Sequence, residues 1–267
     1  MSAAQWVRLG GRLAQLRPWT NRPADWDRRW SSSDVAIALE LARDGRLGPW
    51  QSMAAHLPPG GRVLEAGCSY GAVVVALCAQ GFEAEGVDFA DDTIARALAV
   101  DPSLPLSVGD VTALDVADGH YDGYVSIGVA EHDPEGPDAI LREARRVLRP
   151  GGVALISVPQ LTRRRQARRR RADEVALADV ADRFYQYYFT ADEFEACLRR
   201  HALEPFARHP YGVYAGLTRD IGWIDRAMNS RWLPQAGRAW ADELCRRAPR
   251  RLVGGWAHML MLAARAV

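Results

Sequence analysis

The chain has 267 residues with 34 basic and 33 acidic side chains, so a formal net charge of +1 directs it to neither nucleic acid nor membrane. Hydrophobic residues make up 48% and charged residues 25%, which is ordinary for a globular protein that builds one α/β domain with additions. The sequence contains no lysine, and we attribute this to a GC-rich coding sequence rather than to function.

The four cysteines are scattered and form no CxxC pair, so we expect no disulfide framework, no structural zinc and no bound metal. No apolar run reaches the roughly 18 residues that a membrane span needs. The N-terminus also lacks the apolar segment of a signal peptide. We therefore expect a reduced, soluble, cytoplasmic protein.

The first 50 residues are rich in arginine and tryptophan and predict an N-terminal helical cap, 1–50. Apolar residues at helical spacing predict a helix over 5–16, and they are Trp6, Leu9, Leu13 and Leu16. With its arginines, segment 5–17 has the composition of a helix that contacts a membrane surface. The alternative is a helix packed on the domain, which we favour because Gly10-Gly11 weakens an isolated helix.

A further helix is expected from about Val35 to Leu41, with Ser33 or Asp34 as its N-cap. From residue 62, strands then alternate with helices. The strands are expected at 62–67, 83–88, 105–109, 121–127 and 152–158, and the helices at 71–80, 91–99 and 137–148. This alternation predicts βαβ units and a parallel sheet within a core of residues 51–267. Arg149-Pro150-Gly151-Gly152 is expected to form a turn before the fifth strand.

The segment 161–182 changes character, because Arg163–Arg171 holds seven arginines. One interpretation is a patch that binds RNA or phosphate. The other is a solvated helix whose arginines pair with Asp173, Glu174 and Asp179. We favour the second, since the run has no interleaved aromatic residues.

The C-terminal part begins with an aromatic run, 184–189, and a helix from Thr190 to Arg200 in which Thr190 and Glu193 form a capping box. Strands are expected at 203–210 and 257–264, separated by a cap insertion, 212–250. All nine tryptophans lie before residue 51 or after residue 222. This distribution is consistent with two additions that close over the core as a lid, or with simple packing of peripheral helices.

Residues 63–71, Val-Leu-Glu-Ala-Gly-Cys-Ser-Tyr-Gly, have the pattern of a strand, a tight turn and a helix N-terminus. Gly67 and Gly71 are not spaced as in G-x-G-x-x-G, and Glu65 would repel a pyrophosphate. An acid in this position suits a ligand with an amine-bearing end instead.

Two further acids end the next strands. Asp88 lies where a carboxylate accepts hydrogen bonds from ribose hydroxyls, although it could also be a helix cap. Phe89 beside it could cover an adenine ring or fill the core. Asp110 could accept the exocyclic amine of adenine, or be an ordinary residue of a strand-end turn.

Together these motifs resemble class I S-adenosylmethionine-dependent methyltransferases, and most closely the small-molecule type 11 and type 12 groups. The motifs are Glu65–Gly71, Gly86-Val87-Asp88, Gly109-Asp110-Val111, Tyr121–His132 and Arg146–Gly152. The resemblance covers roughly 60–160, and 184–211 more loosely. One departure is Ser69, which stands where the family pattern has glycine and affects loop geometry rather than cofactor identity.

The resemblance implies a doubly wound, Rossmann-like sheet of seven mostly parallel strands, with an antiparallel last strand and helical N- and C-terminal lid additions. It implies that S-adenosylmethionine is the cofactor and that the loop after the first strand holds its amino-acid part. Asp88 would hold the ribose, Asp110 with Val111 the adenine, and Gly128 and Val129 would lie near the methyl group. The loop residues are Glu65, Ala66, Gly67, Cys68, Ser69 and Gly71.

Methyl transfer from this cofactor to an acceptor is an in-line displacement. Its rate depends mainly on how the acceptor atom, the methyl group and the sulfur are positioned, and it needs no metal. We expect a small-molecule acceptor, with a hydroxyl of a sugar, glycan or natural product favoured. His132 is the first candidate for a general base, its alternative being a structural histidine. Glu131, His209 and Tyr188 are weaker candidates. The candidate acceptor-binding residues are Trp30, Tyr188, His209 and Tyr211.

Three other functions stay open at this point. An RNA methyltransferase would use Arg163–Arg171, but no Asn/Asp-Pro-Pro-aromatic sequence follows the fourth strand. A nicotinamide dehydrogenase is disfavoured by the glycine spacing and by Glu65. A non-catalytic subunit that binds the cofactor and partners an active methyltransferase would keep the same binding motifs.

Overall fold

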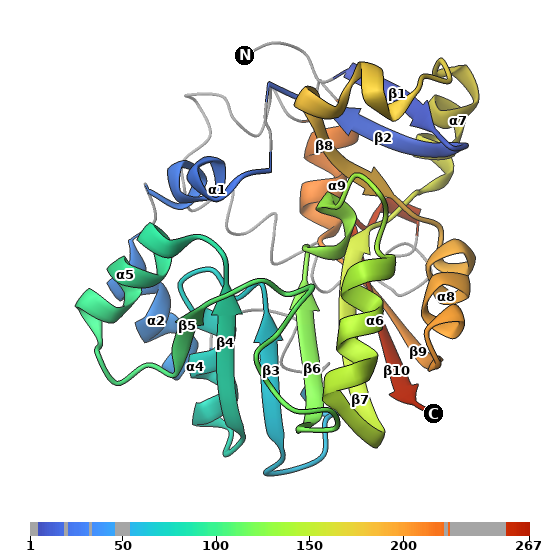
Figure 1. The fold of residues 1–267 in the computed structure, drawn as a ribbon. Helices are drawn as coiled ribbons and strands as arrows, with labels where there is room; N and C mark the ends of the chain where they lie inside the picture. The colour runs from blue at the N-terminus through green and yellow to red at the C-terminus, as the bar shows by residue number, and fades with distance from the viewer. Residues whose placement is uncertain (1–4, 19–20, 32–33, 46–53, 222–223, 225–254) are drawn as a thin grey trace.

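The centre of the computed structural model is a seven-stranded sheet with the order β5-β4-β3-β6-β7-β10-β9 (Figure 1). The structure describes residues 5–18, 21–31, 34–45, 54–221, 224 and 255–267. The strands are β3 (Arg62–Ala66), β4 (Glu83–Asp88), β5 (Leu106–Val108), β6 (Tyr121–Ile127), β7 (Leu148–Pro159), β9 (Leu203–Tyr211) and β10 (Met259–Ala266). β3 to β7 are parallel, and β10 runs antiparallel to both neighbours. The predicted seven-stranded topology is confirmed.

Helices cover both faces of this sheet. α2 (Val35–Arg43), α4 (Ala72–Ala79) and α5 (Asp91–Val100) pack on one face, and α6 (Asp138–Val147) and α8 (Ala191–Arg200) on the other. Successive strand residues point to opposite faces. Val63 therefore joins the core under α4, and Leu64 joins the core under α6. Burial on both faces explains why the strands of the sheet are so apolar.

The segment 5–16, for which the sequence predicted a helix, is a β-hairpin. β1 (Gln5–Leu9) pairs antiparallel with β2 (Arg12–Leu16), and the two-residue loop is Gly10-Gly11, with φ of +54° and +77°. Two positive φ values are what a tight hairpin turn requires and what a helix forbids. The helix prediction was wrong because the glycine pair was read as a weak point in a helix rather than as a turn.

Segment 5–16 does not form the amphipathic helix that a contact with a membrane surface would need. β2 pairs with β8 (Phe184–Tyr188) to make a second, three-stranded sheet, and Val7, Leu9 and Leu16 are buried in the same core as α6 and α8. The membrane-contact interpretation of 5–17 is therefore not supported, because its apolar side chains are already used. None of the described helices is long and apolar enough to cross a bilayer.

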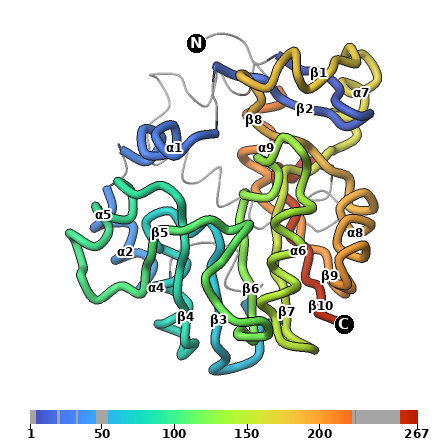
Figure 2. The backbone as a smooth tube through the Cα atoms, viewed as in Figure 1, coloured from blue at the N-terminus to red at the C-terminus, as the bar shows by residue number. Residues whose placement is uncertain are grey.

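The second sheet and α1 (Pro23–Trp30) lie above the end of the main sheet at which the parallel strands finish (Figures 1 and 2). The C-terminal addition contributes α9 (Val213–Asp220), and most of the insertion 212–250, with Trp223, Trp232 and Trp240, lies outside the described residues. The N-terminal cap is thus a hairpin followed by α1 and α2 rather than helical throughout.

The arginine run forms a helix, α7 (Arg163–Arg171), as the interpretation of a solvated helix predicted. The carboxylates that pair with its arginines differ from those expected. Arg165 is buried and pairs with Asp220 at 3.0 Å, and Arg169 pairs with Glu193 at 2.6 Å. Glu174 pairs with Arg8 instead, while Asp173 and Asp179 make no ion pair within the described residues. The partners come from other elements because α7 packs against the hairpin and α9 rather than against its own C-terminal flank.

Three further local predictions can be compared with the structure. Asp34 caps α2 by accepting from the Ile37 N–H at 3.1 Å, and Ser33 lies outside the described residues. Residues 149–152 belong to β7 rather than to a separate turn, and the pairing of β6 with β7 shifts register there. Thr190 and Glu193 form the predicted capping box at the start of α8.

Replacing Thr190 by alanine removes the oxygen that accepts from the Glu193 N–H at 3.1 Å. We expect the free energy of unfolding to fall by about 1 kcal/mol, the usual effect of losing an N-cap. Urea unfolding followed by circular dichroism measures it. Thr190→Ser is the matched control, because it keeps the hydroxyl. Equal losses in the two variants would contradict the role of the cap.

Candidate functional site

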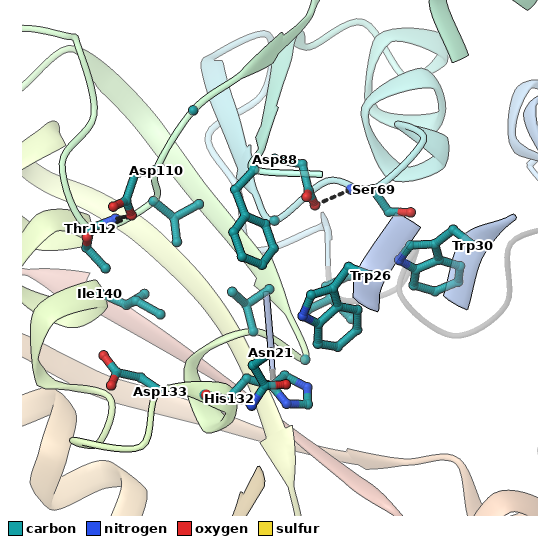
Figure 3. A pocket seen from close by; sticks show the side chains of 17 residues that line it. Asn21, Trp26, Trp30, Ser69, Asp88, Asp110, Thr112, His132, Asp133 and Ile140 are labelled. Atoms are coloured by element: carbon teal, nitrogen blue, oxygen red, sulfur yellow. Dashed lines mark hydrogen bonds between the residues drawn. The ribbon is translucent and has the colours of Figure 1, made fainter. Parts of the chain in front are cut away.

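A cavity opens at the carboxyl ends of the parallel strands, below α1 (Figure 3). Its cavity volume is about 210 Å³, smaller than the roughly 300–1,000 Å³ of pockets that hold drug-sized ligands. Its lining residues come from the N-terminal addition and from the loops after four strands. They are Asn21, Trp26, Trp30, Gly67, Ser69, Asp88, Phe89, Gly109, Asp110, Val111, Thr112, Ile127, Gly128, Val129, His132, Asp133 and Ile140.

The loop between β3 and α4 forms one wall of this cavity. Gly67 has φ +82°, and a Cβ at this position would lie 2.3 Å from the Val129 Cγ2, so only glycine fits there. Ser69 has φ +51°, in the left-handed region that favours glycine. This conformation explains why the family pattern has glycine at the position of Ser69, and it shows that serine keeps the turn.

Asp88 at the end of β4 holds that loop in place. Its Oδ2 accepts from the Ser69 N–H at 2.7 Å, and its Oδ1 accepts from the Ala90 N–H at 2.9 Å (Figure 3). Asp88 is 7% exposed as a residue, and burial raises the pKa of its carboxyl group above the ordinary value. Each oxygen has a second lone pair, so Asp88 can accept further hydrogen bonds from a ligand in the cavity.

Ser69 supplies a polar group that the protein leaves unused. Its Oγ is buried and has no hydrogen-bond partner among the described residues, although it lies on the cavity wall. A buried hydroxyl without a partner is costly. A ligand with polar atoms beside the β3–α4 loop would satisfy it, so the donor set on this wall fits a polar cofactor.

Asp110, Val111 and Phe89 lie on the cavity as predicted. Asp110 Oδ1 accepts from the Thr112 N–H at 2.8 Å and the Thr112 hydroxyl at 2.7 Å, which leaves Oδ2 out of both bonds. Phe89 is 40% exposed, which is unusual for an aromatic ring that fills a core. The structure therefore brings Phe89 and Asp110 together on the cavity lining.

Four of the predicted loop residues lie behind the cavity wall rather than on it: Glu65, Ala66, Cys68 and Gly71. Glu65 is buried, and its Oε2 accepts from the Val74 N–H at 3.1 Å, which ties β3 to the first turn of α4. Burial raises the pKa of Glu65 well above its ordinary value. The expected contact of Glu65 with an amine stays a prediction.

His132 lines the cavity and has a defined orientation. Its Nδ1 lies 2.6 Å from the Tyr185 carbonyl oxygen, so Nδ1 carries the proton and Nε2 is left as an acceptor. Burial lowers the pKa of His132 to about 4. Trp26 packs edge-on against the ring, with centroids 4.8 Å apart. The imidazole is therefore neutral at pH 7 and presents a free lone pair.

Glu131 lies directly beside this histidine. Its Oε1 is 3.8 Å from the His132 Nε2, and its Oε2 has no hydrogen-bond partner among the described residues. The side chain is 2% exposed, and burial raises its pKa to about 8. Burial thus favours the protonated form of Glu131.

Among the predicted acceptor residues, only Trp30 lies on the cavity. Tyr188 is buried in the small sheet, where its hydroxyl bonds to Gln15. His209 contacts His56 with Nε2 atoms 2.7 Å apart, and the Tyr211 hydroxyl donates to Ser157 at 2.9 Å. The structure does not bring these three to the cavity, because β8 places Tyr188 in the small sheet and β9 places His209 and Tyr211 at the edge of the main sheet.

The N-terminal addition supplies residues that the sequence did not indicate. Asn21 has φ +54°, and its Nδ2 donates to the carbonyl oxygens of His132, Phe184 and Tyr185 at 3.0–3.2 Å. It thereby anchors the start of α1 beside His132. Trp26 lies on the cavity next to it, and the only signal for it was the clustering of tryptophans. Within the described residues, no group of three or more His, Cys, Asp or Glu is arranged to hold a metal ion.

Comparison with known proteins agrees with this geometry. A family model described as a methyltransferase domain matches residues 42–205, more than half of the chain. A probable S-adenosylmethionine-dependent methyltransferase of Mycolicibacterium smegmatis is 37% identical over 39% of this chain and 40% of its own. A demethylmenaquinone methyltransferase of Beutenbergia cavernae is 32% identical over 51% of this chain and 56% of its own length. The chain thus spans about half, or less, of the length of these curated relatives.

Solved structures share the fold. A 1,6-didemethyltoxoflavin-N1-methyltransferase of Burkholderia thailandensis, solved with its acceptor and S-adenosylhomocysteine, aligns over 96% of both chains with a TM-score of 0.51 and 19% identity. At this identity the likeness concerns the fold alone. With the matched family model, the seven-stranded topology and the motifs at the strand ends, this chain belongs to the class I S-adenosylmethionine-dependent methyltransferase family.

Proposed function

We propose that this protein transfers a methyl group from S-adenosylmethionine to a small-molecule acceptor. The observation that carries the proposal is the cavity wall formed by Gly67, Ser69 and Asp88, in which a buried carboxylate and an unpartnered hydroxyl lie beside a glycine that permits close approach. When bound, the cofactor supplies an activated methyl group. The protein has to bind it, position the acceptor and accept a proton.

We assign the binding residues by their places on this wall. Ser69 with the Gly67 turn would hold the amino-acid end of the cofactor. Asp88 would accept from the ribose hydroxyls, and Asp110 with Val111 would hold the adenine, with Phe89 covering its face. Glu65 would support the loop from behind through Val74. Gly128 and Val129 would line the space between cofactor and acceptor.

For the acceptor, we propose a hydroxyl of a natural product in preference to a sugar or glycan. A relative named demethylmenaquinone methyltransferase supports a quinone-type compound, and Trp26 and Trp30 supply flat apolar surfaces at the cavity. His132 would be the general base, because its neutral imidazole presents Nε2 while Tyr185 fixes its other nitrogen. Residues 1–50 would act as a cap on the core of residues 51–267.

The alternatives have less support. Of the seven arginines proposed to bind RNA, Arg165 and Arg169 already pair with Asp220 and Glu193, and none of α7 lines the cavity. A non-catalytic partner subunit would use the same cofactor wall without a base. Turnover that depends on His132 would exclude the non-catalytic partner subunit.

Asp88→Asn should weaken the binding of S-adenosylhomocysteine by roughly 5- to 150-fold, the equivalent of about 1–3 kcal/mol for a lost buried acceptor. Isothermal titration calorimetry measures the affinity directly. Asp92→Asn, an exposed position at the start of α5, is the control. Unchanged affinity in Asp88→Asn, or no binding to the wild-type protein, would overturn the proposed cofactor site.

His132→Ala should lower turnover by roughly 10²- to 10⁴-fold, the usual contribution of a general base. The affinity for S-adenosylhomocysteine should be unchanged. Acceptors are found by screening quinols and phenols with radiolabelled S-adenosylmethionine. Because the pKa of His132 is about 4, kcat/KM of the wild type should stay level from pH 8 down to about 5 and fall only below that. Full activity of His132→Ala, with His120→Ala as control, would exclude this base.

Glu131→Gln should change how stability depends on pH. The folded-state pKa of about 8 lies above the unfolded value near 4.5, so the native protein holds one more proton between them. The free energy of unfolding of the wild type should therefore fall as pH rises through this window, by at most about 1.4 kcal/mol per pH unit. Urea unfolding at pH 5 and pH 8 should show a smaller fall for Glu131→Gln than for the exposed control Glu135→Gln. Equal falls would contradict a buried, protonated Glu131.

A further inference from the structure

The helix α1 covers the cavity without belonging to a hydrophobic core. Trp26 and Trp30 line the cavity, yet none of the hydrophobic clusters among the described residues includes a side chain of α1. Between α1 and α5 lies an open groove lined by alanine, serine and charged side chains. The position of α1 therefore depends on a few polar and ring contacts rather than on buried apolar surface.

One of these contacts is a helix cap that α1 supplies to α5. The Oδ1 of Asp27 accepts from the Thr93 N–H at 2.8 Å and from the Thr93 hydroxyl at 2.7 Å. The N-cap residue of α5 itself is Ala90, which offers no side-chain acceptor. The first N–H groups of a helix stay unpaired unless a side chain accepts from them. Asp27 caps α5 only while α1 lies in this position.

The two tryptophans carry the position of α1 to both sides of the cavity. Trp26 directly precedes Asp27 and packs edge-on against His132 (Figure 3). Trp30 packs edge-on against Tyr70, with ring centroids 5.7 Å apart, and Tyr70 follows Ser69 in the β3–α4 loop. Docking of α1 thus fixes one ring beside the candidate base and another beside the loop of the cofactor wall.

The cavity below α1 has to widen when ligands enter or leave. With α1 docked its volume is about 210 Å³, and a pocket for even one drug-sized ligand measures roughly 300–1,000 Å³. A cofactor together with an acceptor needs more room than that. Because α1 takes no part in a hydrophobic core, it is the lining element that can move without opening the core.

Asp27 also lies near the carboxylate that anchors the cofactor wall. Asp88 accepts from the Ala90 N–H, and Asp27 accepts from the N–H of Thr93, three residues further along. Burial is the main cause of the raised pKa of Asp88, and the charge of Asp27 adds to it, so the two carboxylates repel each other. A ligand hydroxyl that donates to Asp88 would weaken this repulsion. Ligand binding should therefore tighten the contact between Asp27 and Thr93.

We propose that Asp27 is a positioning residue that locks α1 over the cavity and so controls how fast the cofactor is released. The inference rests on the proposed function, since the lock would hold S-adenosylmethionine in that same site. While Asp27 caps α5, Trp26 and Trp30 stay in place over the cavity. When the contact with Thr93 breaks, α1 moves away about its N-terminal end, where Asn21 is bonded to three carbonyl oxygens.

Asp27→Ala should speed the release of S-adenosylhomocysteine by roughly 10-fold, because both hydrogen bonds to Thr93 are lost. Surface plasmon resonance on the immobilised protein measures the dissociation rate. Hydrogen–deuterium exchange followed by mass spectrometry reports on α1 itself. In the wild type, S-adenosylhomocysteine should slow the exchange of segment 23–30, and Asp27→Ala should speed this exchange with and without the ligand.

Two further variants separate the lock from a general loss of stability. Asp27→Asn keeps an oxygen that can accept from Thr93, so its release rate should stay within about 2-fold of the wild type. Asp34→Ala removes the cap of α2, in which the Asp34 Oδ1 accepts from the Ile37 N–H at 3.1 Å. It should lower the free energy of unfolding as much as Asp27→Ala does, but leave the release rate and the exchange of segment 23–30 unchanged.

The inference is overturned if Asp27→Ala releases S-adenosylhomocysteine at the wild-type rate, or if Asp27→Asn or Asp34→Ala accelerates release as much. It is also overturned if the ligand binds the wild type without slowing the exchange of segment 23–30, a result that needs no variant to fold. The proposed function survives each of these outcomes. It fails only if calorimetry detects no binding of S-adenosylhomocysteine to the wild type, so the two failures are distinguishable.

Discussion

The site depends on one carboxylate, that of Asp88, which accepts from two loops at once. Its bond to the Ser69 N–H fixes the β3–α4 loop, and its bond to the Ala90 N–H fixes the start of α5. Asp88 thereby holds the left-handed turn at Ser69, which a serine adopts less readily than glycine. Without this carboxylate, the glycine turn and the cavity wall that it forms would lack their common anchor.

The cap over this wall is held by polar contacts of a different kind. Asn21 donates to three carbonyl oxygens that belong to the loop after β6 and to β8. This joins the N-terminal addition, the small sheet and the candidate base into one unit. Tyr185 belongs to the same unit, since its carbonyl orients His132 and its ring supports Arg17. The candidate base is therefore oriented by one short strand, β8.

Two buried polar atoms without hydrogen-bond partners among the described residues lie at or beside the cavity, the Ser69 Oγ and the Glu131 Oε2. The hydroxyl of Ser69 and the carboxyl of Glu131 are both buried and unsatisfied within the described residues. A core built for stability alone would replace such groups by apolar ones. Ser69 lines the cavity, and Glu131 lies beside His132, which also lines it.

The sequence by itself determined the seven-stranded sheet, the capped helices and the places of Gly67, Ser69, Asp88, Asp110 and His132. These residues follow strands directly, and parallel strands bring their carboxyl ends to one edge whatever the rest of the chain does. The hairpin at 5–16 had a local signal in Gly10-Gly11, but only the tertiary structure decided that it pairs with β8, which lies about 170 residues away in the chain. It also decided that Trp26 and Asn21 reach the cavity while Tyr188, His209 and Tyr211 do not. Such contacts depend on how separate elements dock, and local spacing carries no information about docking.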